Sequence, residues 1–334
     1  MPEIAAPPPP KRDRSSTWGR KGLAVLWRLG LSVLIVGVLL HFVDWDRMVA
    51  AALDLEPWRL TAAAAGLIAL SLAGAVRWWG LLRLRGYGAT LLWVMRVRLI
   101  AQGLSVALPG GVAGDILSVF YVTEYPKRTA SHTLGTVFAD RVLGLAAIVA
   151  TCAAAVATDP LVAAVLGDVA FSFGGYLPYA AGGAFAAILV MILLGRRFAR
   201  RFYLAAANAV RMLAGYRHHV WAMLALLGYS IILHLAVCVL VWWVGRDLGP
   251  VDLWSVVMAV SLTMLLSILP VSYNGLGIRE ATFLLFLVHS GFPSEAAIVL
   301  SLVWLALTVT SLGAVGALAA AFTPAPDTSR KLRH

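Results

Sequence analysis

The stretch Ser267-Ile-Leu-Pro-Val-Ser-Tyr-Asn-Gly-Leu-Gly-Ile-Arg-Glu280 interrupts a chain that is otherwise almost continuously apolar. Pro270 lacks the N–H that a helix needs, and Gly275 and Gly277 tolerate backbone conformations that other residues avoid. The side chains that follow Pro270 form hydrogen bonds or carry charge: Ser272, Tyr273, Asn274, Arg279 and Glu280. Irregular backbone and charge are both energetically costly between two apolar runs, so we predict that this break is functional.

The composition is that of a protein embedded in a lipid bilayer. Of the 334 residues, 61% are hydrophobic and only 13% are charged, and the mean hydropathy is +0.86. A soluble domain carries about twice that share of charge. Several apolar runs also reach the roughly 20 residues that cross a bilayer. We therefore predict an all-α, polytopic helical membrane protein with about six to seven full spans.

The net charge of +11 comes from short basic clusters that separate the apolar runs. This pattern is typical of cytoplasmic loops and argues against nucleic-acid binding, because no soluble basic domain is present to carry it. We predict a disordered basic cytoplasmic tail over 1–21, one transmembrane domain over 22–322 and a second cytoplasmic tail over 323–334. The expected location is the bacterial inner membrane, with both termini cytoplasmic.

Apolar runs and loop charges together place the individual segments. Full spans are expected over 22–43, 58–79, 130–157, 177–194, 220–244 and 296–322. Two further runs, 91–108 and 254–269, each stop at a Pro and resume as a piece of about 11 residues, or about 17 Å as a helix. That length does not cross a hydrocarbon core of about 30 Å. We therefore predict two re-entrant broken-helix hairpins, the first entering from the cytoplasm and the second from outside.

The two breaks share a Leu-Pro followed five residues after the Pro by a Gly. The residues assigned to these breaks are Pro109, Gly110, Gly111 and Gly114 in the first, and Pro270, Gly275 and Gly277 in the second. One hypothesis is an inverted repeat with halves 22–170 and 171–322, an arrangement common among transporters. The alternative is that both hairpins are deep surface loops whose symmetry is accidental.

Charged residues within the apolar segments supply the candidate binding site. A carboxylate at depth must be paired, hydrated or protonated, and Asp115, Asp140 and Glu280 are such carboxylates, with Arg141 and Arg279 as adjacent cations. Cross-pairing of Asp115 with Arg279, or of Arg141 with Glu280, is as compatible with the sequence as pairing of neighbours. These five residues, with Ser272, Tyr273 and Asn274, either bind a charged headgroup or form structural ion pairs and backbone caps. No metal ligand set, cofactor motif or catalytic triad is evident.

Three motifs together resemble a known family: Leu108-Pro-Gly-Gly-Val-Ala-Gly-Asp115, Asp140-Arg141-Val-Leu-Gly-Leu, and Leu269-Pro-Val-Ser-Tyr-Asn-Gly-Leu-Gly-Ile-Arg-Glu-Ala281. The chain is similar over about residues 22–320 to the lysylphosphatidylglycerol synthase transmembrane region, also described as flippase-like membrane proteins. The resemblance implies the translocase half alone, without the aminoacyl-transferase domain. Some stand-alone relatives accompany hopanoid-lipid synthesis. One departure is that the Arg usual soon after the Gly-Asp is missing after Asp115.

The sequence therefore favours a lipid translocase that moves a phospholipid or related polar lipid between leaflets through a polar cavity at the midplane. Two alternatives from other classes stay open. One is a membrane-embedded lipid-modifying transferase that uses Asp115 or Glu280 as a base. The other is a non-catalytic partner of a separate lipid-synthesis enzyme, for example in a hopanoid or aminoacyl-phospholipid pathway. Membrane lipids are the expected partners, and an enzymatic activity is the less favoured prediction.

Overall fold

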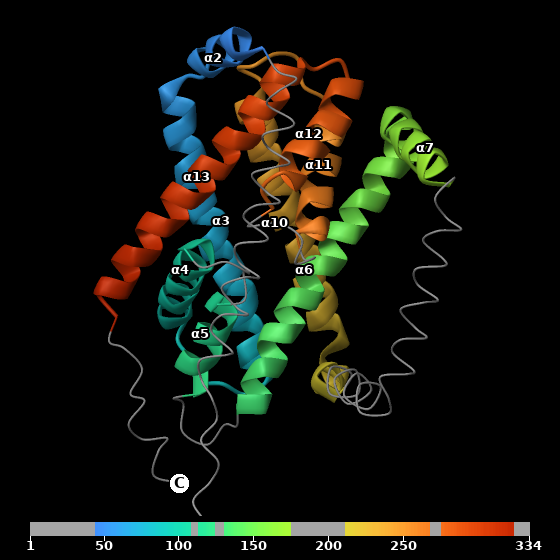
Figure 1. Cartoon of the computed structure of the whole chain (residues 1–334). Helices are drawn as coiled ribbons and strands as arrows, with labels where there is room; N and C mark the ends of the chain where they lie inside the picture. The colour runs from blue at the N-terminus through green and yellow to red at the C-terminus, as the bar shows by residue number, and fades with distance from the viewer. Residues whose placement is uncertain (1–43, 108–112, 124–129, 175–210, 268–274, 324–334) are drawn as a thin grey trace, which may run out of the picture.

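The computed structural model describes residues 44–107, 113–123, 130–174, 211–267 and 275–323, and these residues form helices joined by short connections (Figure 1). Four helices are long and apolar enough to cross a membrane: α3 (Pro57–Leu84), α6 (Ala130–Thr158), α10 (Val220–Gly245) and α13 (Ser294–Ala321). Each has 26 to 29 residues, or about 40 Å at 1.5 Å per residue. This confirms the all-α membrane class. The expected spans at 22–43 and 177–194 lie outside the described residues.

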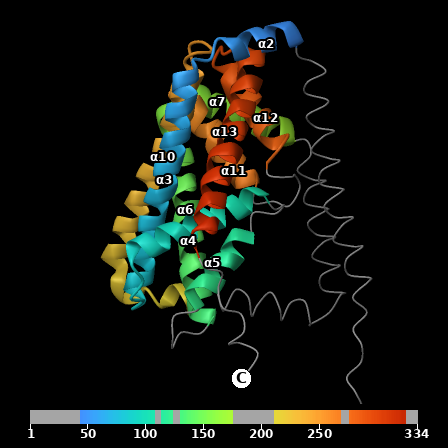
Figure 2. The same ribbon diagram turned by 90° about the vertical axis from the view of Figure 1, so that its left-hand side faces the viewer.

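Shorter helices occupy the positions of the two predicted hairpins. α4 (Leu91–Ala107) packs against α5 (Ala113–Thr123), and α11 (Leu253–Leu266) packs against α12 (Ile278–Phe283). α12 continues as a π-helical turn, η2 (Leu284–Val288). In both ribbon views, α4 and α5 lie in the lower half of the molecule, and α11 and α12 lie in the upper half (Figures 1 and 2). Pro109, Gly110, Gly111 and Pro270, which were expected to make the breaks, lie outside the described residues.

Two helices form where the sequence suggested only connections. α2 (Trp45–Leu53) begins after Asp44, whose Oδ1 accepts hydrogen bonds from the backbone N–H groups of Asp46 and Arg47 at 3.0 and 3.3 Å. α7 (Pro160–Gly174) begins after Asp159, whose Oδ1 accepts from the N–H of Leu161 at 2.8 Å. An Asp at the N-cap satisfies the free N–H groups of a first turn, and Pro is favoured at the first helical position. The N-cap Asp residues and Pro160 are visible in the sequence, but these segments were predicted to be connections between spans.

The two halves of the described chain run in opposite directions. α3 runs down and α6 runs up, whereas α10 runs up and α13 runs down (Figure 1). Each half also packs a long helix against the short pair of the other half, because α13 contacts α4 and α6 contacts α11. The α4–α13 crossing is very close: a Cβ on Gly103 would lie 2.8 Å from the Cα of Gly316. Two glycines at this crossing therefore bring the helix backbones into direct contact.

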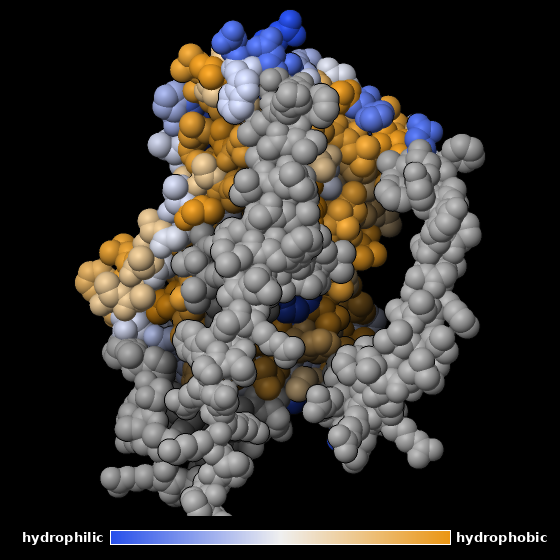
Figure 3. Space-filling model, viewed as in Figure 1, coloured by the Kyte–Doolittle hydropathy of each residue, from blue (hydrophilic) through white to orange (hydrophobic). Residues whose placement is uncertain are grey.

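Charge separates the two ends of the molecule. The upper end, formed by α2, the starts of α3, α7 and α13, and the 246–252 connection, is mainly acidic. It is held by an ion pair from Arg59 on α3 to Asp247, 2.7 Å between Nη1 and Oδ1. The described Arg residues at the lower end are Arg83, Arg85, Arg96, Arg211 and Arg217. Figure 3 shows hydrophilic side chains gathered over α2, with mainly hydrophobic surface on the helices below.

Candidate functional site

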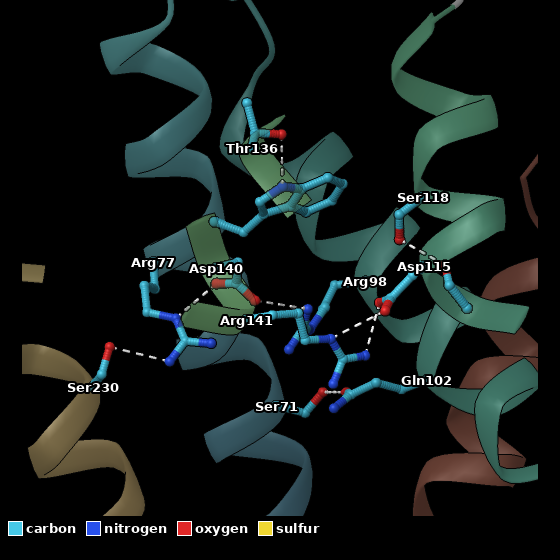
Figure 4. A network of polar contacts seen from close by, with 12 residues as sticks. Ser71, Arg77, Arg98, Gln102, Asp115, Ser118, Thr136, Asp140, Arg141 and Ser230 are labelled. Carbon is cyan, nitrogen blue, oxygen red and sulfur yellow. Dashed lines mark hydrogen bonds and ion pairs between the residues drawn. The ribbon is translucent and has the colours of Figure 1, made fainter. Parts of the chain in front are cut away.

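A buried carboxylate lies between two arginines, as Figure 4 shows from close by. Asp140 on α6 is only 4% exposed at its side chain. It accepts a hydrogen bond from Nε of Arg77 on α3 at 2.7 Å, and one from Nη1 of Arg98 on α4 at 3.4 Å. Arg77 is further fixed by donating from Nη1 to the hydroxyl of Ser230 on α10 at 3.1 Å. Asp140 thus joins three helices, and α10 is tied to them through Arg77.

A second ion pair lies beside the first and is more accessible. Arg141, the next residue on α6, donates from Nε and Nη2 to the two carboxylate oxygens of Asp115 on α5, at 3.0 and 2.8 Å. This two-point geometry is the strong form of a guanidinium–carboxylate contact. The Arg141 side chain is 58% exposed and that of Asp115 is 27% exposed. Adjacent residues on α6 therefore belong to one buried and one exposed contact.

We call Arg77, Arg98, Asp115, Asp140 and Arg141 the arginine cluster. Three cations face two carboxylates, which leaves one positive charge when all five are ionised. Neutral polar groups continue the cluster, because the Ser71 hydroxyl on α3 donates to the Gln102 amide oxygen on α4. Within an apolar part of the molecule, a surplus cation favours an anionic ligand.

Close packing of α5 on α4 sets the position of Asp115. A Cβ on Gly114 would lie 2.8 Å from the carbonyl carbon of Ala101 and still closer to the Ala101 oxygen and the Ser105 hydroxyl. Only glycine fits at this contact. One turn later, the Ser118 hydroxyl donates to the Gly114 carbonyl at 2.9 Å. The structure places Gly114, which was predicted to belong to the break, in the first turn of α5, where its missing side chain lets this turn lie on the α4 backbone.

Arg279 and Glu280 form a different arrangement on α12. Glu280 is 1% exposed at its side chain, and its Oε2 accepts from the N–H of Gly277 at 2.5 Å while its Oε1 accepts from the Ser301 hydroxyl at 3.2 Å. Nε of the buried Arg279 lies 3.9 Å from Oε1 of Glu280. Gly277 itself has φ of +87°, which other residues rarely adopt. Glu280 is therefore engaged in capping its own helix and joining it to α13.

The helix α13 passes both the arginine cluster and the Arg279–Glu280 pair, so the distance between the two can be estimated along it. Ser301 of α13 contacts Glu280. Gly316 of α13 contacts Gly103 of α4, which lies five residues after Arg98. The two positions are 15 residues apart, or about 22 Å along a helix. Asp140 lies ten residues from the start of α6, about 15 Å above its lower end. The arginine cluster is thus nearer the lower, basic end, and the Arg279–Glu280 pair is nearer the upper, acidic end.

The structure brings Asp115, Asp140 and Arg141 together and does not bring Arg279 and Glu280 to them. The cross-pairings of Asp115 with Arg279 and of Arg141 with Glu280 are not formed. Instead Asp115 pairs with Arg141, and Glu280 lies beside Arg279. Of the three states expected for a carboxylate at depth, the structure shows pairing with an arginine for Asp115, Asp140 and Glu280. Ser272, Tyr273 and Asn274 lie outside the described residues.

Sequence reasoning missed Arg77 and Arg98. Arg77 lies near the end of the predicted span 58–79, where a basic cytoplasmic loop was expected to begin, but α3 continues for seven residues beyond Arg77, to Leu84. Arg98 lies in the early part of the predicted segment 91–108, an end expected at the membrane interface, but its side chain contacts Asp140. The sequence did show a carboxylate, Asp140, within a predicted span, and it showed arginines within other predicted segments. Together these residues indicated that Asp140 pairs with an arginine, but not with which one. Asp140 is 63 residues from Arg77 and 42 residues from Arg98 along the chain, so the sequence alone did not show that they pair.

The arginine cluster is also distinct from a surface depression formed by other described residues. That depression, of about 670 Å³, lies at the upper end and is lined by Trp242, Arg246, Gly249, Pro250, Val251, Asp252 and Ser290. It is shallow and far from the cluster, so we do not assign the site to it. In the described part of the chain, no group of three His, Cys, Asp or Glu side chains is placed to hold a metal ion.

Long apolar helices with a charged cluster between them define an integral, multi-pass helical membrane protein. The chain belongs to the family of the lysylphosphatidylglycerol synthase transmembrane region, whose family model matches residues 25–316. The family resemblance carried by the three sequence motifs is therefore confirmed. No curated protein sequence matches the chain.

Proposed function

We propose that this protein is a lipid translocase that moves a polar lipid with an anionic headgroup between the two leaflets. The observation that carries this proposal is the arginine cluster. Three arginines and two aspartates from four helices lie within an otherwise apolar part of a membrane protein, with one positive charge in excess. Charged groups inside a membrane domain typically mark a substrate path.

The two parts of the cluster have different roles in this proposal. Arg77 and Arg98 hold Asp140 in a buried contact that joins α3, α4 and α6. Arg141 faces a more open environment, and its planar guanidinium presents the paired donors that recognise phosphate. The headgroup phosphate therefore binds first at Arg141, while the acyl chains remain in the bilayer.

The opposite directions of the two halves support an inverted repeat of the kind found in transporters. In each half, a long helix is followed by a short pair and then by a second long helix. α4 and α5 then form a re-entrant hairpin from one side, and α11 and α12 form another from the other side. The basic lower end is the cytoplasmic side by the positive-inside rule, with both termini in the cytoplasm of a bacterium.

Reconstituted vesicles with fluorescent phospholipids test this function. The purified protein is expected to accelerate the exchange of labelled lipid between leaflets, which a membrane-impermeant quencher reports. Arg141→Gln is expected to lower the rate at least tenfold, because it removes the exposed phosphate-binding cation. Arg47→Gln, an exposed arginine on α2 at the other end, is the matched control and is expected to leave the rate unchanged.

Two outcomes would count against the proposal separately. If vesicles with the wild-type protein exchange lipid no faster than protein-free vesicles, translocation is wrong. If exchange is fast and Arg141→Gln matches the wild type, translocation stands but the site assignment fails. Mass spectrometry of the lipids recovered from the same vesicles also separates transport from a lipid-modifying transferase, which would change their covalent structure.

A further inference from the structure

The two aspartates of the arginine cluster differ sharply in how firmly they are held. Asp140 is buried and receives hydrogen bonds from two arginines on different helices. Asp115 contacts one arginine, Arg141, and both side chains are partly exposed at the protein surface. A partly exposed ion pair is held less firmly than a buried one and can exchange its partner for a ligand. Asp115 is therefore the carboxylate that a ligand at Arg141 meets.

Asp115 uses the same donors that a phosphate would use. Its two oxygens accept from Nε and Nη2 of Arg141, the edge of a guanidinium that binds two oxygens of a phosphate. A bound phosphate therefore either replaces the Asp115 carboxylate at this edge or lies beside it on the remaining donors. In both positions the negative charge of Asp115 repels an anion, and the repulsion increases with the charge on that anion.

The net charge of the arginine cluster determines which anion it can neutralise. With Asp115 ionised, the five residues have one positive charge in excess, which a phosphodiester neutralises. A phosphomonoester carries close to two negative charges at about pH 8. It would leave the cluster with a net negative charge in an apolar region. Without Asp115, two positive charges would be in excess, and the doubly charged anion would be matched.

We infer that Asp115 is the residue that determines charge specificity, and that it restricts the site to singly charged phosphodiester headgroups by rejecting phosphomonoesters. This inference rests on the proposed function, since it concerns the same site. Specificity of this kind is a difference between two affinities, and a repulsive group directed against the wrong ligand is an efficient way to produce it. Gly114 and its contact with α4 hold that repulsive group in place.

Two short-chain lipids that differ by one methyl group provide the test. Phosphatidylmethanol is a phosphodiester with one negative charge, and phosphatidic acid with the same acyl chains is the corresponding monoester. Their dissociation constants are measured for the detergent-solubilised full chain at about pH 8 and fixed ionic strength. The wild type is expected to prefer phosphatidylmethanol. In Asp115→Asn, the ratio of the two constants is expected to shift at least tenfold toward phosphatidic acid.

Controls separate a local effect from a general one. Asp168→Asn removes the same charge from an exposed position on α7 and is expected to leave the ratio within twofold of the wild type. Asn at 115 keeps the shape of Asp and an oxygen that accepts from Arg141. Asp115→Ser provides the same loss of charge in a smaller side chain, and its ratio is measured in the same way if the Asn variant does not fold.

The outcomes also separate this inference from the proposed function. An unchanged ratio in Asp115→Asn, or an equal change in Asp168→Asn, would overturn the charge-specificity role even if the protein moves lipid between leaflets. A shifted ratio in a protein that moves no lipid would support the role of Asp115 and remove translocation. Phosphatidic acid that binds the wild type as tightly as phosphatidylmethanol also contradicts the inference.

Discussion

Asp115 and Glu280 follow the two breaks in the apolar sequence, one in each half of the molecule, and the structure engages them in different ways. Glu280 turns back to its own helix, where it accepts from Gly277 and from Ser301 of α13. Asp115 turns outward and meets Arg141 on another helix. The same local pattern of glycine, break and carboxylate therefore yields a buried structural cap in one half and an accessible ion pair in the other. A symmetric sequence pattern does not imply a symmetric site.

Replacing Glu280 should have the largest effect on stability. Glu280→Ala leaves the Gly277 N–H and the Ser301 hydroxyl without their acceptor and removes the carboxylate beside the buried Arg279 guanidinium. Breaking a buried ionic contact costs about 3–5 kcal/mol. The free energy of unfolding in detergent micelles is the measurement. Asp168→Ala, at an exposed carboxylate on α7, is the control, and an equal loss in both variants would refute the structural role of Glu280.

An intermediate effect is expected where α5 meets α4. Gly114→Ala places a methyl group inside the contact with Ala101, and overpacking of this kind costs about 1–3 kcal/mol. The displacement of α5 also moves Asp115 away from Arg141, so the lipid exchange rate should fall as well. Gly167→Ala on α7 adds the same methyl group where no atom lies within 4 Å. If the two variants are equally stable, the close α4–α5 contact is wrong.

The smallest effect on stability is expected at Asp115 itself. Asp115→Ala removes an ion pair whose arginine is more than half exposed, so it should cost less than breaking the buried contact of Glu280. Its unfolding free energy should lie close to that of the wild type, in contrast to Glu280→Ala. A loss as large as that of Glu280→Ala would show that Asp115 is structural, and the difference between the two halves would disappear.

The sequence predicted the parts of the fold that depend on length and hydropathy. The boundaries of α6, α10 and α13 lie within two residues of those that the apolar runs predict, whereas α3 extends five residues beyond its predicted end. Pro and Gly between the apolar runs indicated the shorter helices. The composition of the arginine cluster depends instead on which face of each helix turns inward. Arg77 and Arg98 lie close to Asp140 only because α3, α4 and α6 pack together, and charge along a linear sequence does not show this. Asp115 and Arg141 were each predicted as site residues, but their pairing depends on the close packing of Gly114 against Ala101 of α4.

The glycine contact between α4 and α13 has a mechanical consequence. At Gly103 and Gly316 no side chain separates the two backbones, so a change of rotamer cannot absorb a shift of one helix against the other. Ser301, nearer the other end of α13, is bonded to Glu280. The same continuous helix, α13, therefore contacts both the cap of α12 and α4, the helix that carries Arg98. The cap of α12 and the α4 helix are thus packed on one rigid element, at positions about 22 Å apart along its axis.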